Sequence, residues 1–506
     1  MSEVNESPDR RRWLVLAVIG IAQLMVVLDA TVMNIALPSA QHALRFTTAD
    51  RQWVVTAYTL AFGSLLLLGG RLADLAGRKV TFLIGLLGFA GVSAVGGAST
   101  SFAMLVTARA CQGMFGALLV PAALSLLTTT FTEPGERGKA FGVYGAIAAA
   151  GGAVGLLLGG TLTEYLSWRW ALYINLFFAG TAFVGGLALL RHQPSRVRPK
   201  LDIPGVLAES SAVFCLVYGF SNAATRDWHT PSTYGFLAAG VALLVVFAWW
   251  QLRAANPLLP PRVAVDRNRG GAYLSMLIAS SGMFAVFLFL TYYLQQTLGY
   301  SPVVTGLGFL PIAGGIAVSA NLSNIVLMPR FGPKPIVAAG MLAAAGAMVW
   351  FTRLGVHTGY ATGVAGPLVL TGLGFGMVIA PSINTGTFGV ARQDAGIASA
   401  TVTVGQQLGA SIGTSLLNTI FASAVTSYIA AHIVAVQGHV TPAVTGLALT
   451  HGYDTAFWWI AAILAGGAVV SGTLFRRGPI APPTPAAART DVLADAETMV
   501  RHSEPG

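Results

Sequence analysis

Three ionisable side chains lie inside long apolar segments of this chain, namely Asp29, Arg109 and Glu209. An ionised group inside a membrane costs about 2.5–3.5 kcal/mol on insertion scales, so such residues are candidates for function. If the segments are helices, Asp29 lies eight residues before the end of its segment near Leu37, and Arg109 lies seven residues after the start of its own near Phe102. At 1.5 Å per residue, these offsets place the two charges about 12 Å and about 10 Å from the same face of the membrane. The carboxylate and the guanidinium can therefore meet.

A carboxylate that faces a guanidinium in this setting can act as a protonation switch. A proton bound at Asp29 would neutralise the acid, release Arg109 and change which conformation of the protein is favoured. A buried ion pair with a purely structural role is the alternative. Glu209 lies four to five residues inside its segment, so it either has a function or extends its carboxylate to the cytoplasm. We predict that Asp29 and Arg109 handle protons, and the role of Glu209 stays open.

Soft and polar side chains near this pair indicate a cavity wall. Met25 and Met33 flank Asp29 at a spacing of four residues, and Gln112 follows Arg109 by three, so each lies on the face of its ionisable neighbour. Thioethers suit pockets that accept varied shapes, although methionine stripes and polar side chains also pack helices together. Further candidates for a substrate cavity are Asn34, Tyr58, Tyr292, Asn321 and Gln406.

Motifs of enzymes and of ATP-driven pumps are missing from the sequence. No glycine-rich loop of the phosphate-cradling kind occurs. No cluster of histidines and carboxylates falls inside the apolar segments, and Cys111 and Cys215 lie in separate apolar runs. We expect a protein that is not an enzyme, holds no metal or cofactor and draws its energy from a proton gradient.

The elements that must position these residues follow from the composition. Of 506 residues, 55% are hydrophobic and only 9% are charged, whereas a soluble domain carries about 25% charged residues. This excludes soluble enzymes and nucleic-acid-binding proteins, and it predicts an all-α membrane protein. A helix of about 20 residues crosses a bilayer, and fourteen segments of suitable length lie at roughly 13–37, 52–70, 80–99, 103–129, 140–163, 170–190, 203–221, 233–251, 270–293, 303–327, 336–352, 363–383, 396–421 and 453–475.

The distribution of Lys and Arg predicts the orientation, because these residues stay in cytoplasmic loops. With the N-terminus inside, 23 of the 29 basic residues fall on the cytoplasmic side, five fall outside and Arg109 falls within a span. Both termini are then cytoplasmic, and the protein is a multi-pass protein of the plasma membrane. The net charge of +10 is thus a signal of topology rather than of a nucleic-acid partner.

Two sequence patterns that occur in both halves of the chain predict an internal repeat. Glycines recur at a spacing of four in two segments, at Gly151, Gly155 and Gly159 and at Gly405, Gly409 and Gly413, a pattern that lets helices approach closely. The loop RLADLAGRKV also resembles MPRFGPKPIV, which aligns Gly77 and Lys79 with Gly332 and Lys334. Repeated halves are typical of secondary transporters, whose substrate site lies between them. The predicted parts are a cytoplasmic tail at 1–12, a six-helix bundle at 13–190, an inserted helix pair at 203–251, a second six-helix bundle at 270–475 and a disordered cytoplasmic tail at 476–506.

The chain resembles the fourteen-helix drug:proton antiporters of the major facilitator superfamily along essentially its whole length. The resemblance rests on six segments in order: LDATVMNIALP, GRLADLAGRKV, the residues Leu105, Arg109, Gln112 and Gly113, the glycines Gly155, Gly159 and Gly160, WRWALYIN, and YLQQTLGYSPVVTGLGFLP. The sequence departs from the family pattern at Leu156 and Phe177, where prolines are usual, at Leu75, where an arginine is frequent, and at Pro329, where the first half has an aspartate.

The resemblance implies a gate at the cytoplasmic ends of the helices. Its residues would be Gly70, Asp74, Gly77, Arg78 and Lys79, near Glu136 and Arg137 of the next inner loop. These groups would hold the inner side shut in the outward-open state through ion pairs and helix-end dipoles.

The activity that the resemblance implies is export of amphipathic drugs or toxic organic compounds in exchange for protons, by alternating access. Its partners would be a small neutral or singly charged substrate, protons and the lipid bilayer, with no nucleic acid, and the protein would be monomeric. Two other functions stay open. One is dedicated export of a single metabolite that the host makes, such as an antibiotic, and the other is a membrane sensor that no longer transports.

Overall fold

The computed structural model describes residues 8–46, 48–191, 201–225, 228–356, 358–391, 394–433 and 442–478. These residues are largely helical and include no strand, because only a helix satisfies all its backbone polar groups within one segment in lipid. Thirteen helices among them are long and apolar enough to cross a membrane. A further helix, α5 (Pro134–Tyr165), has 32 residues and is about 48 Å long, which exceeds the hydrocarbon core of about 30 Å. The predicted all-helical membrane fold is confirmed.

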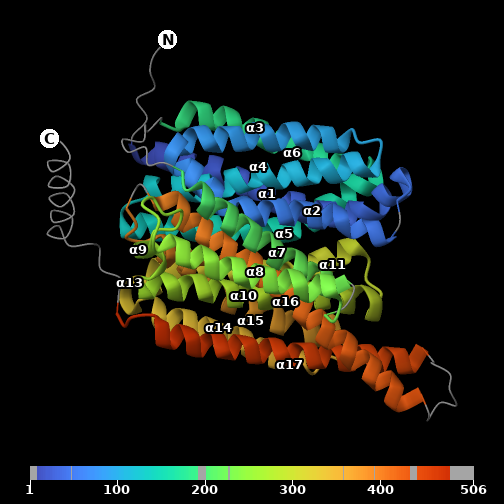
Figure 1. The fold of residues 1–506 in the computed structure, drawn as a ribbon. Coiled ribbons are helices and arrows are strands. Elements are labelled where there is room, and N and C mark those ends of the chain that lie inside the picture. Colours follow the sequence, from blue (N-terminus) through green and yellow to red (C-terminus); the bar gives the residue numbers. More distant parts are fainter. Residues whose placement is uncertain are drawn as a thin grey trace, which may run out of the picture.

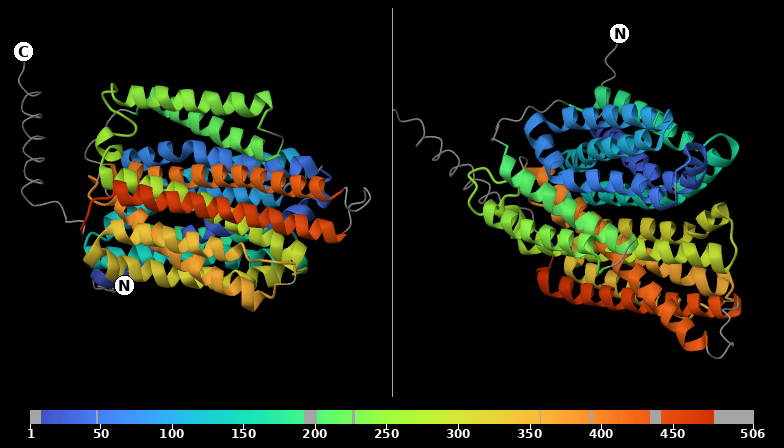
Figure 2. Two further views of the ribbon diagram at one scale, coloured as in Figure 1. Left: turned by 90° about the horizontal axis from the view of Figure 1, so that it is seen from below. Right: turned by 45° about the vertical axis from the view of Figure 1, so that its right-hand side comes forward.

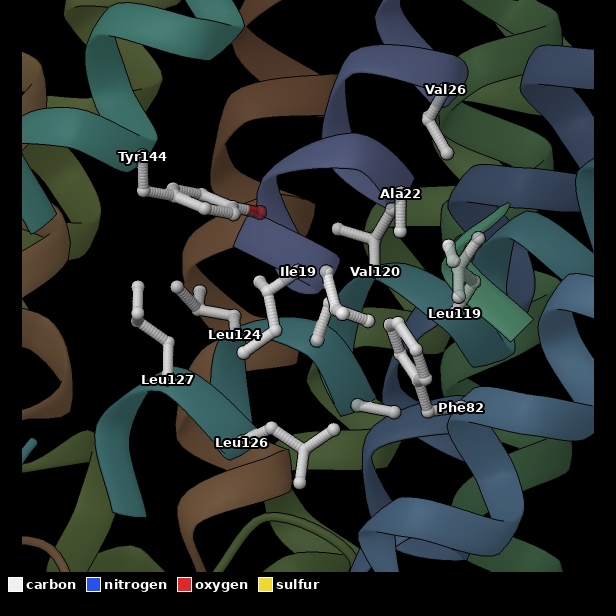
Figure 3. Packing of buried hydrophobic residues seen from close by; sticks show 14 of the residues in the cluster. Ile19, Ala22, Val26, Phe82, Leu119, Val120, Leu124, Leu126, Leu127 and Tyr144 are labelled. Atoms are coloured by element: carbon white, nitrogen blue, oxygen red, sulfur yellow. The ribbon is translucent and has the colours of Figure 1, made fainter. Parts of the chain in front are cut away.

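The first six helices form one bundle, coloured blue to teal in the upper half of Figure 1. A hydrophobic cluster at its centre joins α1, α3 and α4 through Ile19, Phe82 and Val120, and Tyr144 of α5 borders it (Figure 3). This cluster fixes the first, third and fourth helices relative to one another. The bundle consists of α1 (Pro8–Leu44), α2 (Thr48–Ala76), α3 (Arg78–Gly97), α4 (Phe102–Thr130), α5 and α6 (Trp170–Leu189).

The second bundle is coloured yellow to red and fills the lower half of Figure 1. Three short π-helical segments lie within this bundle, one after α10, one after α12 and one before α15, and such segments often occur at functional sites. Its elements are α10 (Arg267–Tyr292), η1 (Tyr293–Thr297), α11 (Pro302–Gly308), α12 (Leu310–Leu322), η2 (Ser323–Leu327), α13 (Met328–Phe331), α14 (Pro333–Phe351), η3 (Tyr360–Val364), α15 (Ala365–Thr387), α16 (Ala395–Ile433) and α17 (Pro442–Leu474).

Two more helices, α7 (Ile203–Thr225) and α8 (Pro231–Gln251), lie along the side of the molecule where the bundles meet (Figure 2). Of the two, α7 packs against α2 of the first bundle and α16 of the second. A short helix, α9 (Pro261–Ala264), follows the pair. The carboxylate of Asp202 fastens the base of this pair, since it accepts hydrogen bonds from Trp250 Nε1 at 2.8 Å and Gln251 Nε2 at 2.9 Å.

Each glycine stripe packs on the first helix of its own bundle. The α5 stripe meets side chains of α1, and the α16 stripe lies against backbone carbonyl groups of α10, so the same pair of positions is in close contact in both bundles. This is the relation that an internal repeat requires. The glycines are Gly151, Gly155 and Gly159 on α5, facing Val27, Thr31 and Val32, and Gly405, Gly409 and Gly413 on α16, facing Tyr273, Leu277 and Ser281.

Several predicted boundaries differ from the structure. Helix α1 begins at Pro8, within the segment 1–12 that was predicted as a cytoplasmic tail. The segment 303–327, predicted as one span, corresponds to the single candidate span Val303–Phe331, within which α11, α12, η2 and α13 follow one another. Helices α1, α16 and α17 extend beyond their predicted spans, since those spans were sized to the apolar core and helices continue through polar turns. Residues 1–7 and 479–506, which include most of the predicted tails, lie outside the described residues.

Candidate functional site

An ion pair at the centre of the first bundle joins α1 and α4. Arg109 Nη1 lies 2.6 Å from Asp29 Oδ2, and the two side chains are 2% and 0% exposed. The sequence predicts similar membrane depths for Asp29 and Arg109, and in the structure the two side chains are in direct contact. A buried pair of this kind is costly to break, by about 3–5 kcal/mol when one partner is removed, because the other is left as an uncompensated charge.

Two amide side chains complete the surroundings of the carboxylate. Gln112 Nε2 donates to Asp29 Oδ1 at 3.1 Å, and Asn175 Nδ2 from α6 donates to the same oxygen at 2.7 Å. Both amides also donate to Ser93 Oγ of α3, at 2.7 and 3.3 Å. All of these side chains are buried. Three donors, one of them a cation, therefore converge on one carboxylate.

The guanidinium of Arg109 is fixed by further contacts with α2 and α4. Its Nε donates to the backbone carbonyl of Val54 at 3.3 Å, and its Nη1 donates to Gln112 Oε1 at 3.0 Å. The cation also lies 4.5 Å from the centre of the Tyr58 ring, a favourable cation–π arrangement. Gly113 allows this geometry, since a Cβ there would collide with the backbone oxygen of Tyr58. Arg109 therefore connects the pair to α2.

Sequence reasoning missed two members of this network, Asn175 and Ser93. Asn175 ends the segment WRWALYIN, so its place in a motif could have drawn attention to it, but its contact with Asp29 spans 146 positions of sequence. Ser93 lies within an apolar run of α3, as many packing serines do, and nothing in the pattern distinguishes it.

A second set of polar contacts joins the two bundles. Asp74, near the end of α2, accepts hydrogen bonds from the backbone N–H groups of Gly396 at 2.9 Å and Ile397 at 3.2 Å, in the first turn of α16. A carboxylate at a helix N-terminus is stabilised by the free N–H groups and the helix dipole. Gly70, one turn earlier on α2, lets the backbones touch, because a Cβ there would lie 2.5 Å from the Gly396 carbonyl oxygen.

Arg137 supplies the other half of this connection from α5. Its Nε donates to Asn384 Oδ1 and its Nη2 to Thr387 Oγ1, both at 2.8 Å, and both acceptors belong to α15. Nη1 donates to the Thr128 carbonyl at 3.4 Å. We call the contacts of Asp74 and Arg137 with the second bundle the latch. It lies at the end of the molecule where α1 begins and α17 ends, the left side of Figure 1, and we call this side the latch end.

The other residues of the predicted gate lie beside the latch within the first bundle. Arg78 donates to Ser125 Oγ at 2.7 Å and lies 3.8 Å from Asp74 Oδ1, while Gly77 makes the turn between α2 and α3 with a φ of 96°. Lys79 does not reach the second bundle, because its Nζ donates to the last carbonyls of α6 at Leu187 and Leu190. Glu136, expected near Asp74, pairs instead with Arg12 at 3.1 Å.

The predicted cavity residues are placed in different surroundings. Met25 and Met33 are fully buried in two separate hydrophobic clusters, as the packing alternative predicted. Tyr58 and Gln112 belong to the Asp29 network. Asn321 Nδ2 donates to the Ala317 carbonyl, Tyr292 packs against the core of the second bundle, and Gln406 is half-buried on α16. Gly160 faces α11, since a Cβ there would lie 3.3 Å from the Val303 side chain. The side chain of Asn34 lies outside the described residues.

Groups that could hold a metal ion are not found in the described part of the chain, where no three His, Cys, Asp or Glu side chains gather. Cys111 and Cys215 are free thiols. Glu209 is buried, at 2% exposure, so the expectation that its carboxylate could extend to the cytoplasm is not met in this conformation.

Comparisons with known proteins agree on one family. The model described as Major Facilitator Superfamily matches residues 19–414. The chain is 47% identical to the puromycin resistance protein pur8 of Streptomyces alboniger, over 94% of this chain and 93% of that one. It is 39% identical to the cephamycin export protein CmcT of Amycolatopsis lactamdurans, over 79% and 83% of the two chains.

One further relative and one solved structure extend the comparison. The tetracenomycin C resistance and export protein of Streptomyces glaucescens is 36% identical, over 82% of this chain and 77% of that one. The crystal structure of the human organic anion transporter MFSD10 (TETRAN) shares the fold, with a TM-score of 0.62 at 16% identity, over 92% of this chain and all of that one. The chain is a multi-pass membrane transporter rather than an enzyme, and it belongs to the Major Facilitator Superfamily.

Proposed function

We propose that this protein exports amphipathic organic compounds, antibiotics among them, in exchange for protons that enter the cell. Export is supported by relatives named for antibiotic resistance and export. Proton coupling is supported by one observation above all, the buried Asp29–Arg109 pair at 2.6 Å. No cofactor takes part, and the proton gradient across the plasma membrane supplies the energy.

The Asp29 network can couple a proton to a change of conformation. Protonation of Asp29 removes the charge that holds Arg109 and the two amides, and the lost pairing of about 3–5 kcal/mol is comparable to the few kcal/mol that separate alternative states. Arg109 bonds to the Val54 carbonyl of α2, and the same helix carries Asp74 of the latch. Loss of the pair would therefore alter how α2 is held, and with it the stability of the latch.

The latch end is the cytoplasmic side in this proposal, since the loops there carry most of the basic residues. The present conformation, with the latch closed, then faces outward. The protein acts as a monomer with both termini in the cytoplasm. One proton that falls through about 100 mV yields about 2.3 kcal/mol, enough for a gradient of roughly fiftyfold in a neutral substrate.

Efflux of a panel of dissimilar antibiotics from cells, at two external pH values, tests the proposal. Wild-type cells should keep out several compounds, and more strongly at acidic pH, while Asp29→Asn should lose the dependence on pH. Glu136→Gln serves as the control, because it removes a carboxylate from the partly exposed Arg12–Glu136 pair. Unchanged pH-driven efflux in Asp29→Asn would remove Asp29 as the proton carrier.

Dedicated export of a single antibiotic is the second candidate. It is favoured by the relatives' names, which mention one compound each: puromycin, cephamycin and tetracenomycin C. The same panel separates the two candidates, since a dedicated exporter would protect cells against one structural class and leave the others unaffected.

A further inference from the structure

Glu209 on α7 is a buried carboxyl group that the mechanism above does not use. Its side chain is 2% exposed. Oε1 has no hydrogen-bond partner, and Oε2 has one long contact, at 3.4 Å, from the hydroxyl of the adjacent Ser210. Asp29 has three donors, one of them a cation, so these two acids have opposite surroundings.

The position of Glu209 on α7 places it where three helices meet. Val206, three residues earlier, packs in a cluster with Leu67 of α2 and with Ile397 of α16. Val213, four residues later, packs in a second cluster with α2, and α16 side chains border it. Residues three and four apart share one face of a helix, so Glu209 lies between the two clusters, on the face of α7 that meets α2 and α16.

Cations do not compensate this carboxyl group in the described part of the chain. On the part of α2 that follows Leu67, the charged groups are Arg71, which is buried but forms no ion pair with Glu209, and Asp74, which is bonded to α16. Asp202, which directly precedes α7, is held by four hydrogen bonds, and α8 has no charged residue or histidine. At the start of α16, Asp394 pairs with Arg262, and His432 lies at the opposite end.

An ionised carboxylate in such surroundings would lack both water and a counter-charge, a state that buried acids avoid by binding a proton. We propose that Glu209 is a second proton-binding site, occupied while the latch is closed. This inference rests on the proposed proton-coupled export for its role in the cycle, but not for the presence of the proton.

Opening of the latch provides the route by which the proton leaves. The walls around Glu209 are α2 and α16, the helices that Asp74 and the Gly70–Gly396 contact join. When these helices separate at the latch end, water reaches Glu209, the carboxylic acid ionises and the proton passes to that water. Renewed closure requires a proton to be bound again, so the inserted pair α7–α8 takes part in coupling.

The proposal changes the number of protons for each substrate from one to two. Each proton adds a factor of about fifty, for every 100 mV, to the largest gradient of a neutral substrate. Replacing Glu209 by glutamine should therefore lower that gradient about fiftyfold at the same membrane potential, without abolishing transport.

Infrared spectra of the full-length protein in lipid nanodiscs at neutral pH test the proton directly. The wild type should show the C=O band of a protonated carboxyl group, Glu209→Gln should lose it, and Glu136→Gln should retain it. The proposal is overturned if the band is absent from the wild type or unchanged in Glu209→Gln. Should that variant fail to fold, Glu209→Asp is used instead, and an unshifted band would count against the proposal.

Proteoliposomes that export puromycin, the compound named in the 47% relative, or whichever antibiotic the wild type moves, test the role in coupling. At a fixed driving force of about 100 mV, the largest substrate gradient should be about fiftyfold smaller in Glu209→Gln than in the wild type. An unchanged substrate gradient overturns the second-proton role. If the wild type moves no protons with any compound, the proposed function fails, while the infrared result still decides whether Glu209 holds a proton.

Discussion

Single residues in the first bundle hold the carboxylate of Asp29 in place. Asn175 donates to Asp29 Oδ1 at 2.7 Å, and a hydrogen bond to a charged group contributes about 1.5–3 kcal/mol. In Asn175→Ala the ionised form loses this donor and the protonated form is favoured. We expect the pH profile of coupled efflux from cells to shift toward higher pH in this variant.

The control for this prediction is Ser93→Ala. Ser93 contacts both amides but not the carboxylate, so the shift should be smaller. An Asn175→Ala profile that coincides with the wild-type profile would show that this donor does not influence proton binding.

The sequence predicts the position of a single residue well when the geometry of one helix determines it. The depths of Asp29 and Arg109 follow from a constant rise per residue, and the two side chains are in contact. Arg137 could be identified as a gate residue, but its partners Asn384 and Thr387 lie about 250 positions away and depend on how the bundles dock. The exposure of Glu209 depends on the packing of α2 and α16 around it, which no local pattern reveals.

Among the helices, α5 and η2 cross closely at the latch end. A Cβ at Gly138 would lie 2.6 Å from the Asn324 backbone oxygen, so Gly138→Ala must push the two bundles apart. Overpacking of this kind costs about 1–3 kcal/mol, and we expect the open-latch population to rise about tenfold. Spin-label distances between Glu133 and Arg330, exposed positions at the latch end of the two bundles, report the change.

Gly135→Ala, on the same helix, is the matched control. A Cβ at Gly135 would meet no other atom within 4 Å. If Gly138→Ala gives the same distance distribution as Gly135→Ala, the close crossing does not govern closure.

The base of the inserted pair gives a prediction about stability. Burial alone raises the pKa of Asp202, but hydrogen bonds from Trp250, Gln251, Gly205 and Leu258 outweigh it and lower the pKa below its ordinary value. The stabilisation is therefore present above the unfolded-state pKa of about 3.9 and is lost as the pH falls through the lower folded-state pKa. Thermal unfolding should show this loss in acid for the wild type and a smaller loss for Asp202→Asn, and equal losses would contradict the assignment.

Element boundaries could be predicted only in part. Apolar runs located the helices, but the extension of α1 to Leu44 and of α16 to Ile433 crosses polar residues that hydropathy assigns to loops. The π-helical segments η1, η2 and η3 differ from their neighbours only in backbone hydrogen bonding, for which the sequence carries no periodic signal.

In the whole molecule, one continuous helix, α2, contacts both the Asp29 network and the second bundle. The latch joins the bundles through Asp74 and Arg137, and Arg109 bonds to α2 through Val54. Because a cluster of modest contacts can bias two states that differ by a few kcal/mol, Asp74→Asn should shift the molecule toward the open latch. The Glu133–Arg330 distance should lengthen in this variant, whereas an unchanged distance would show that Asp74 does not hold the bundles together.

Proton movement driven by substrate, measured in proteoliposomes of the wild type and of Asp29→Asn, tests the central claim most directly. Addition of a transported antibiotic to one side should cause an opposite flux of protons in the wild type, and in Asp29→Asn the coupled flux should fall, with the part carried at Asp29 lost. A flux in Asp29→Asn equal to that of the wild type would contradict the account, because the buried acid paired with Arg109 would then not carry the proton.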